Sequence, residues 1–339
     1  MKLNKKAIVM FLTGALAIAS AFPGMATQTT NNAAAGSVQP AAQAVETWNP
    51  SVSAMNVICA PSGIMMMSDG TMVITDTYNK VVWRTKDRES TVIAGKLSAV
   101  DMYGQPIGGY NDSTLTESYF KKPWAVTKYL NGIAVSDSEN NVIRYIGNDG
   151  IETAVGNGTA GFRNGHGMDT AFNNPTGLAT DPYGNLYVAD TNNNAIRRVT
   201  KYGDVKTYID NITEPTGLFW KGDILYVAAS GSHQILKVKD GVIVETIGTG
   251  TEGDVIGAAA QAQFSFPQGV TVADDGSIYV SDTGNSAIKK IANGTVTTLL
   301  MCDYAKMDMY PITPQGLAVY GDKLYVCDNF AKKVIILNR

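Results

Sequence analysis

A repeat that occurs six times along the chain constrains its fold more than any other feature. Each copy opens with proline, and two positions later comes glycine or alanine, at Gly63, Ala125, Gly177, Gly217, Gly269 and Gly316. Twelve or thirteen residues further on, an apolar run ends, and the six runs read MVITD, IAVSD, LYVAD, LYVAA, IYVSD and LYVCD. The chain therefore contains six similar units, spaced by 40 residues (Gly177 to Gly217) to 62 residues (Gly63 to Ala125).

The third unit shows what one copy can form. Pro175 opens a short apolar run, the turn DPYG follows at Asp181, and three further short runs end at Ala189, Val199 and Ile209. Because proline, glycine and Asx residues mark the turns between these runs, the unit indicates four antiparallel strands. Such a small sheet, apolar on both faces, is stable only when it is stacked against others. We therefore predict an all-β fold, a six-bladed β-propeller, over residues 49–339.

The repeated residues resemble the NHL repeat family, in the pattern P-x-G, then D-x-x-G, then Y-V-A-D-T-x-x-N-x-x-I-R. The resemblance extends over residues 58–339 and implies an exported six-bladed propeller. Some enzymes of similar fold hold zinc with three histidines or use one catalytic histidine, and gluconolactonase-like propellers bind calcium through channel residues. This chain has two histidines, and its expected innermost strands carry almost no carboxylates. The resemblance to these enzymes is therefore incomplete.

Closure of the ring requires one more strand than the last unit supplies. Its third strand is expected at Val334 to Leu337, and no fourth run follows it, although the other five units each have one. We predict that Val52 to Ile58, in the segment NPSVSAMNVI, pairs there. An N-terminal strand would then close the last blade and leave no open sheet edge.

The first 26 residues have the composition of a signal peptide. Three lysines precede an apolar segment from Ala7 to Phe22, and small residues follow at Gly24 to Ala26. Residues 27–48 lack apolar periodicity and predict a flexible linker. We expect a secreted or cell-surface protein that meets a membrane only through an uncleaved signal anchor. The formal net charge of −3 indicates no basic field for nucleic acid.

Long connectors enter the first strand of several units, and loops of this kind on a rigid scaffold commonly form a binding face. Both histidines are expected on that face, His166 in the connector to the third unit and His233 in a turn of the fourth. A histidine there could act as acid, base or ligand. Arg163, Asp169 and Tyr110 are loop residues that could join them.

Aromatic residues supply a second set of candidates. Trp124 stands between the proline and the small residue of the second unit, and Tyr304 lies in the connector to the sixth. Exposed aromatic side chains suit sugar faces, proline-containing peptides and protein hot spots.

The repeated aspartates are interpreted as caps of their own turns and not as a ring of metal ligands, because an asparagine follows three residues later in four of them. They are Asp76, Asp137, Asp190, Asp282 and Asp328. The basic residues of the third strands are expected to be solvated or paired near blade edges; these are Arg144, Arg197, Arg198, Lys289 and Lys290. No resident cofactor or metal is predicted, with calcium or zinc left open, and a Cys59–Cys302 disulfide is also left open.

These patterns favour an extracellular binding or scaffolding propeller that recognises a peptide, glycan or protein through its long loops. The alternative is an extracellular lyase or hydrolase that uses His166, His233 or a divalent metal. Catalysis is the less favoured interpretation.

Overall fold

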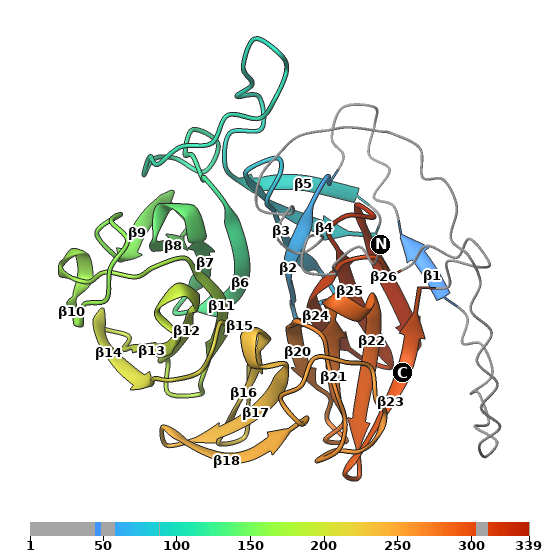
Figure 1. The fold of residues 1–339 in the computed structure, drawn as a ribbon. Coiled ribbons are helices and arrows are strands. Elements are labelled where there is room, and N and C mark those ends of the chain that lie inside the picture. Colours follow the sequence, from blue (N-terminus) through green and yellow to red (C-terminus); the bar gives the residue numbers. More distant parts are fainter. Residues whose placement is uncertain (1–44, 49–57, 88, 303–310, 339) are drawn as a thin grey trace, which may run out of the picture. The chain divides into compact units, whose positions relative to one another are not determined.

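Six antiparallel sheets follow one another along the chain, and each corresponds to one repeat unit (Figure 1). The structure is a computed structural model that describes residues 45–48, 58–87, 89–302 and 311–338. Within residues 45–338 the sheets, called blades 1 to 6 in chain order of their first strands, form a six-bladed β-propeller. The predicted fold class is confirmed.

The first three blades each contain four main strands, and blade 3 has a short fifth strand. Their strands are β2 (Pro61–Met66), β3 (Met72–Asp76), β4 (Val81–Lys86) and β5 (Glu89–Ala94) in blade 1; β6 (Pro123–Tyr129), β7 (Gly132–Asp137), β8 (Val142–Ile146) and β9 (Ile151–Val155) in blade 2; and β11 (Pro175–Thr180), β12 (Leu186–Asp190), β13 (Ala195–Val199) and β14 (Asp204–Ile209), with the added β10 (Gly165–His166), in blade 3.

The last three blades follow the same plan. Their strands are β15 (Pro215–Lys221), β16 (Ile224–Ala229), β17 (Gln234–Lys239) and β18 (Val242–Ile247) in blade 4; β20 (Pro267–Val272), β21 (Ile278–Asp282), β22 (Ala287–Ala292) and β23 (Thr295–Met301), with the added β19 (Gly257–Ala258), in blade 5; and β24 (Pro314–Tyr320), β25 (Lys323–Asp328), β26 (Lys333–Asn338) and β1 (Val45–Trp48) in blade 6.

The repeated P-x-G motif brings neighbouring innermost strands into close contact. A Cβ on Gly177 would lie 2.0 Å from the carbonyl oxygen of Thr216 in the next blade, which no side chain tolerates. In the same way, a Cβ on Gly316 would lie 2.5 Å from the carbonyl oxygen of Ser62. Blade 6 therefore packs directly on blade 1, and the ring closes at its axis.

Side-chain hydroxyls tie the innermost strands together next to these glycines. Thr75 donates from Oγ1 to the carbonyl oxygen of Trp124 at 2.6 Å, and Ser230 donates from Oγ to that of Pro267 at 2.8 Å. Both hydroxyls are buried, so each bond satisfies groups that would be costly to leave unpaired. Small polar residues of a second strand and of a turn thus bind the innermost strand of the next blade and fix the spacing of the blades.

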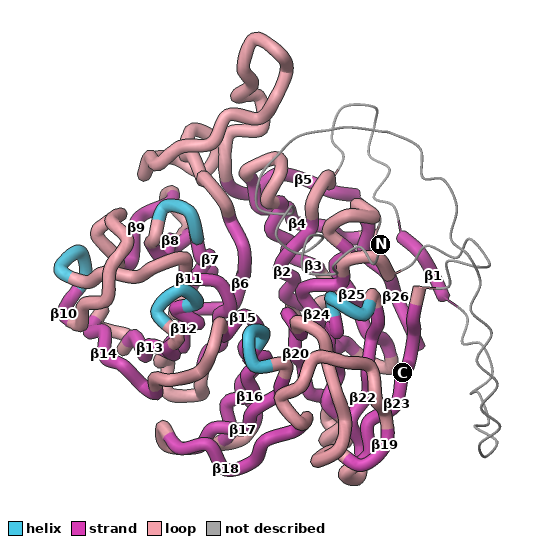
Figure 2. The backbone as a smooth tube through the Cα atoms, viewed as in Figure 1, coloured by secondary structure: helices cyan, strands magenta, loops and turns pink. Residues whose placement is uncertain are grey.

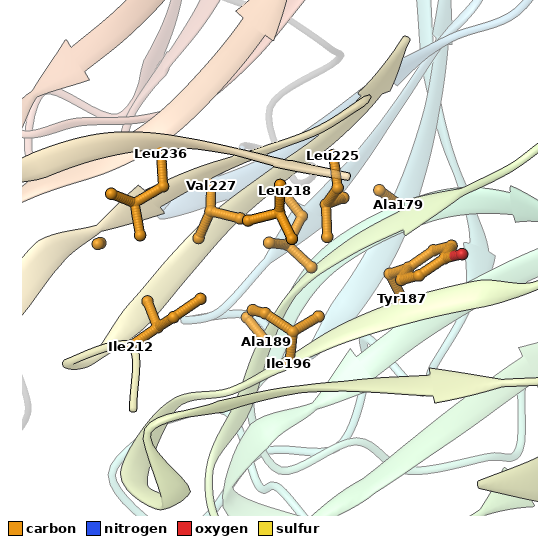
Figure 3. Packing of buried hydrophobic residues seen from close by; sticks show 11 residues of the cluster. Ala179, Tyr187, Ala189, Ile196, Ile212, Leu218, Leu225, Val227 and Leu236 are labelled. Carbon is orange, nitrogen blue, oxygen red and sulfur yellow. The ribbon is translucent and has the colours of Figure 1, made fainter. Parts of the chain in front are cut away.

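Apolar side chains fill the spaces between blades. Figure 3 shows the cluster between blades 3 and 4, which contains Tyr187 of β12 together with Leu218 and Leu225 of blade 4. The Tyr187 ring also stacks on Trp220, with centroids 4.7 Å apart. Each large side chain buried in this way stabilises the fold by roughly 1.5–3 kcal/mol.

The strand that completes blade 6 is β1, paired antiparallel with β26 so that Val45 lies opposite Leu337. The predicted strand Val52 to Ile58 is therefore misplaced, and β1 falls inside the segment predicted as linker; residues 49–57 lie outside the described residues. Distance explains the error. The three residue steps from Ile58 to Pro61 span at most about 11 Å, whereas the outer and inner strands of a four-stranded sheet are about 14 Å apart.

Short 3-10 turns join the second and third strands in four blades (Figure 2). They are η1 (Ser138–Asn140), η3 (Thr191–Asn193), η4 (Ser230–Ser232) and η5 (Thr283–Asn285), while η2 (Gly167–Asp169) lies in a connector. No helix among the described residues is long and apolar enough to cross a membrane. The predicted signal peptide at residues 1–26 lies outside the described residues.

Candidate functional site

Three connectors are held in place by buried cations. Each cation belongs to the third strand of the blade that the connector enters. Arg144, Arg197 and Lys289 have no exposed surface, although they were expected to be solvated or paired at blade edges. Each forms an ion pair with the aspartate seven residues earlier, with N···O distances of 3.4, 2.8 and 2.7 Å. That expectation was wrong for these three residues, since the ion pairs lie in the interior.

Arg197 shows how one cation organises a connector. Its Nη1 donates to the Asp190 carboxylate and to the Ala171 carbonyl oxygen, while Nη2 donates to the Arg163 carbonyl oxygen and to Asn164 Oδ1. The rings of Phe162 and Phe172 lie with their centroids 4.6 and 5.3 Å from Cζ. The connector between blades 2 and 3 is therefore held in a defined conformation by its contacts with Arg197.

The repeated aspartates receive most of their backbone hydrogen bonds from connectors. Asp137 accepts from the amides of Lys121 and Lys122, and Asp190 accepts from the amide of Asn173. Local turn amides are bound by Asp76, from Tyr78 and Asn79, and by Asp328, from Ala331. The carboxylates therefore anchor the entry to the innermost strand as well as their own turns.

Burial raises the pKa of the Asp190 carboxyl above its ordinary value, while the bonds from Asn173, Asn193 and Arg197 act in the opposite direction. The same opposition holds for the pKa of Asp282 beside Lys289. The Asp190–Arg197 and Asp282–Lys289 ion pairs are buried within the blades and hold connectors in place.

Blade 4 departs from this arrangement at both positions. Ala229 replaces the aspartate, and Leu236, seven residues later, replaces the cation; both are buried in the core between blades 3 and 4. The connector into this blade, residues 210–214, is short. A spacing of seven residues between Asp and Arg or Lys in three units, lost together in the fourth, is the signal in the sequence that would have revealed the pairs.

A small cavity of about 70 Å³ lies on the axis and is lined by the innermost strands. Its lining includes five of the six residues that follow the repeated proline, namely Ser62, Trp124, Thr216, Gln268 and Gln315. Gln315 is 8% exposed, and the Oε1 atoms of Gln268 and Gln315 have no hydrogen-bond partner among the described residues. The Lys122 ammonium lies 5.2 Å from the Trp124 ring centroid. Trp124 therefore lines the same cavity as these two unpaired carboxamide oxygens.

The two histidines lie in different parts of the propeller. His166 belongs to β10, which pairs with the outer strand β14, and its Nδ1 is 3.1 Å from Asp204 Oδ1 in an exposed pair. His233 follows η4 with φ 56°, a left-handed position that Asn141 and Asn194 occupy in other blades. Its Nδ1 accepts from the Phe266 amide. The described contacts of the two histidines share no residue, so the structure does not assemble them into one site.

The other candidates are dispersed as well. Tyr110 donates to or accepts from Thr153 Oγ1 at 2.8 Å, and its ring lies 5.4 Å from the Arg144 Cζ, so it covers a buried cation. Arg163 and Asp169 are exposed, and the Arg163 backbone bridges to Ala171. Tyr304 lies outside the described residues. Among the candidates that the structure describes, Trp124 is the one at the axial cavity.

Metal-ligand and thiol chemistry find little geometric support in the part of the chain that the structure describes. There, no three His, Cys, Asp or Glu residues are grouped so that they could hold a metal ion. None of the three cysteines is in a disulfide. Burial raises the pKa of the Cys59 and Cys327 thiols, which makes both poor nucleophiles at neutral pH.

Comparison with known proteins agrees with this architecture. The chain is 32% identical over 220 residues to the protein SUPPRESSOR OF QUENCHING 1, chloroplastic, from Arabidopsis thaliana, which covers 53% of the chain and 20% of that protein. It is 23% identical over 292 residues to human NHL repeat-containing protein 2, which covers 68% of the chain and 40% of that protein. The chain thus spans well under two thirds of these relatives.

A solved structure, that of a catalytically inactive virginiamycin B lyase from Staphylococcus aureus with quinupristin, matches with a TM-score of 0.60 at 17% identity, over 87% of this chain and 99% of the lyase. At that identity the likeness extends to the fold alone. Residues 141–319, more than half of the chain, match the family model described as the Teneurin NHL domain. The chain belongs to this family of NHL-repeat propellers.

Proposed function

We propose that this propeller is an extracellular binding or scaffolding module, which takes a peptide, glycan or protein partner over the mouth of its channel. One observation carries the proposal. Trp124 lines the axial cavity together with Gln268 and Gln315, whose buried carboxamide oxygens have no hydrogen-bond partner among the described residues. An aromatic ring and unpaired acceptors that line one cavity suit a ligand that offers both an apolar face and hydroxyl or amide donors.

The connectors support the proposal because they are rigid. Buried ion pairs at Asp137, Asp190 and Asp282 fix three of them around the ring. A face of this kind loses little conformational freedom when a partner binds, which favours affinity. Export through residues 1–26 is part of the proposal and places the partner outside the cell.

The experiment is retention on peptide and glycan arrays by the protein and by Trp124→Ala. Tyr183→Ala is the matched control, because Tyr183 is 81% exposed in the turn between β11 and β12. A buried aromatic anchor at an interface is worth about 2 kcal/mol or more, so the Trp124 variant should bind at least about 30-fold more weakly. Equal retention by both variants would refute a site at the channel mouth.

The proposal includes no resident metal or cofactor. Elemental analysis of the purified protein tests this point directly. Stoichiometric zinc or calcium would favour the alternative, a lyase or hydrolase that works through His166, His233 or a divalent metal.

A further inference from the structure

The long connectors do more than enter the next blade, because three of them also cover the outer edge of that blade. Strand β10 pairs antiparallel with β14, and β19 pairs with β23. In blade 2 the connector makes a single bridge, Ser113 to Ile151 of β9. Each of these sheets thereby gains an extended segment along a strand whose outer backbone groups would otherwise be open.

The three covering segments share one chemical feature. A small residue stands opposite a branched apolar residue near the start of the outer strand; the pairs are Gly165–Val205, Gly257–Val296 and Ser113–Ile151. The apolar partners are only 1%, 0% and 4% exposed. The covered edge therefore accepts an extended backbone that carries a small side chain at this register.

Blade 4 lacks such a segment among the described residues. Its connector at 210–214 makes no strand, and β18 is the outermost strand of the sheet (Figure 1). Ile243, the second residue of β18 as Val205 is of β14, is 41% exposed. Val242 and Val244 on either side are 61% and 54% exposed. Three consecutive exposed branched residues on an edge strand form a surface that readily pairs with another strand.

We propose that the edge of β18 is a docking site for an extended segment of a partner protein, added antiparallel, with glycine, serine or alanine opposite Ile243. The chain's own β10 and β19 are the templates for this occupant. No charge stands at residues 242–244, and Glu245 is neutralised by Lys237 at 2.7 Å, so a segment that is uncharged opposite these residues fits. A second copy of this chain fits less well. If two β18 strands paired antiparallel about residues 242 and 243, Val242 of one copy would lie opposite Ile243 of the other, where the covering segments have a small residue.

This site is independent of the channel mouth, since it lies on the outer strand of one blade. The probe is a synthetic peptide of residues 253–261, GDVIGAAAQ, which contains the β19 segment. Amide hydrogen exchange of the full chain is followed with increasing peptide. At ten times the dissociation constant, the amides among residues 242–244 that point away from β17 should exchange about tenfold more slowly.

Two controls make the test specific. A peptide in which isoleucine replaces the residue equivalent to Gly257 should give no protection, and this arm changes nothing in the protein. Ile243→Lys should abolish protection, whereas Val100→Lys, at a site of similar exposure (48%) on the connector between blades 1 and 2, should retain it. Absence of protection, or equal protection by either altered partner, would overturn the proposal. Dimerisation of the free protein that Ile243→Lys removes would assign the edge to a second copy instead.

Discussion

Replacing Arg197 by leucine tests whether the buried ion pairs hold the connectors through coupled interactions. The substitution leaves the Asp190 carboxylate at zero exposure without its cation, 2.8 Å away in the native chain. It also removes the donors to the carbonyl oxygens of Arg163 and Ala171. Asp190→Ala has the reverse effect and strands the guanidinium.

The magnitude follows from the cost of an uncompensated buried charge. Breaking a buried pair by removing one partner costs about 3–5 kcal/mol, whereas replacing both with apolar residues is far less costly. Blade 4 supplies the apolar version, since Ala229 and Leu236 occupy the two positions. The double variant Asp190→Ala/Arg197→Leu still loses the anchor of the connector. Its loss of unfolding free energy should nevertheless be smaller than the sum of the two single losses by about 2 kcal/mol or more.

Urea unfolding of the full chain and the three variants gives the coupling free energy. Arg198→Leu is the control, because this neighbouring arginine is partly exposed and should change stability by less than about 0.5 kcal/mol. If the two single losses add within about 0.5 kcal/mol in the double variant, the pair is not coupled. The ion pair would then not be what holds the connector in place.

Two further predictions concern other blades. Burial raises the pKa of the Asp328 carboxyl, so the folded state holds this proton more tightly than the unfolded state does. The protonated carboxyl makes its full contribution to stability below its ordinary pKa of about 3.9, and this contribution declines as pH rises through the folded-state pKa. From about pH 4 upward, the native protein should therefore lose unfolding free energy relative to Asp328→Asn. A constant difference across pH would contradict this. Removing residues 1–48 should lower the melting temperature by several degrees compared with removing 1–44, because β1 pairs with β26; equal melting would show that β1 contributes nothing.

The repeat itself could be predicted because its constraints are local. Proline begins each innermost strand, and the second strands end at the aspartates or at Ala229, as the sequence indicates. The closing strand could not be placed by pattern alone. Both VETW and the segment after it contain β-branched or aromatic residues, and the choice depends on how far the chain must travel to reach Pro61.

The buried cations escaped prediction for a different reason. Arginine and lysine are almost never fully buried unless they are paired, so an interpretation of Arg197 and Lys289 one residue at a time places them at the surface. The sequence alone does not say whether the two histidines lie together, because the path of a long connector depends on the strand with which it pairs. His166 lies in β10 beside β14, at a position that depends on the pairing of that short strand.

Blade 4 shows that the buried ion pair, the long connector and the covered outer edge depend on one another. A buried aspartate needs amide donors from a connector, and a buried cation needs connector carbonyls, as Arg197 finds at Arg163 and Ala171. Where the connector shrinks to residues 210–214, either charge would be desolvated without those partners, and a core alanine and leucine are the stable alternative. The same short connector provides no segment to cover β18. The exposed edge of blade 4 and the apolar residues at its ion-pair positions therefore share one physical cause, the short connector.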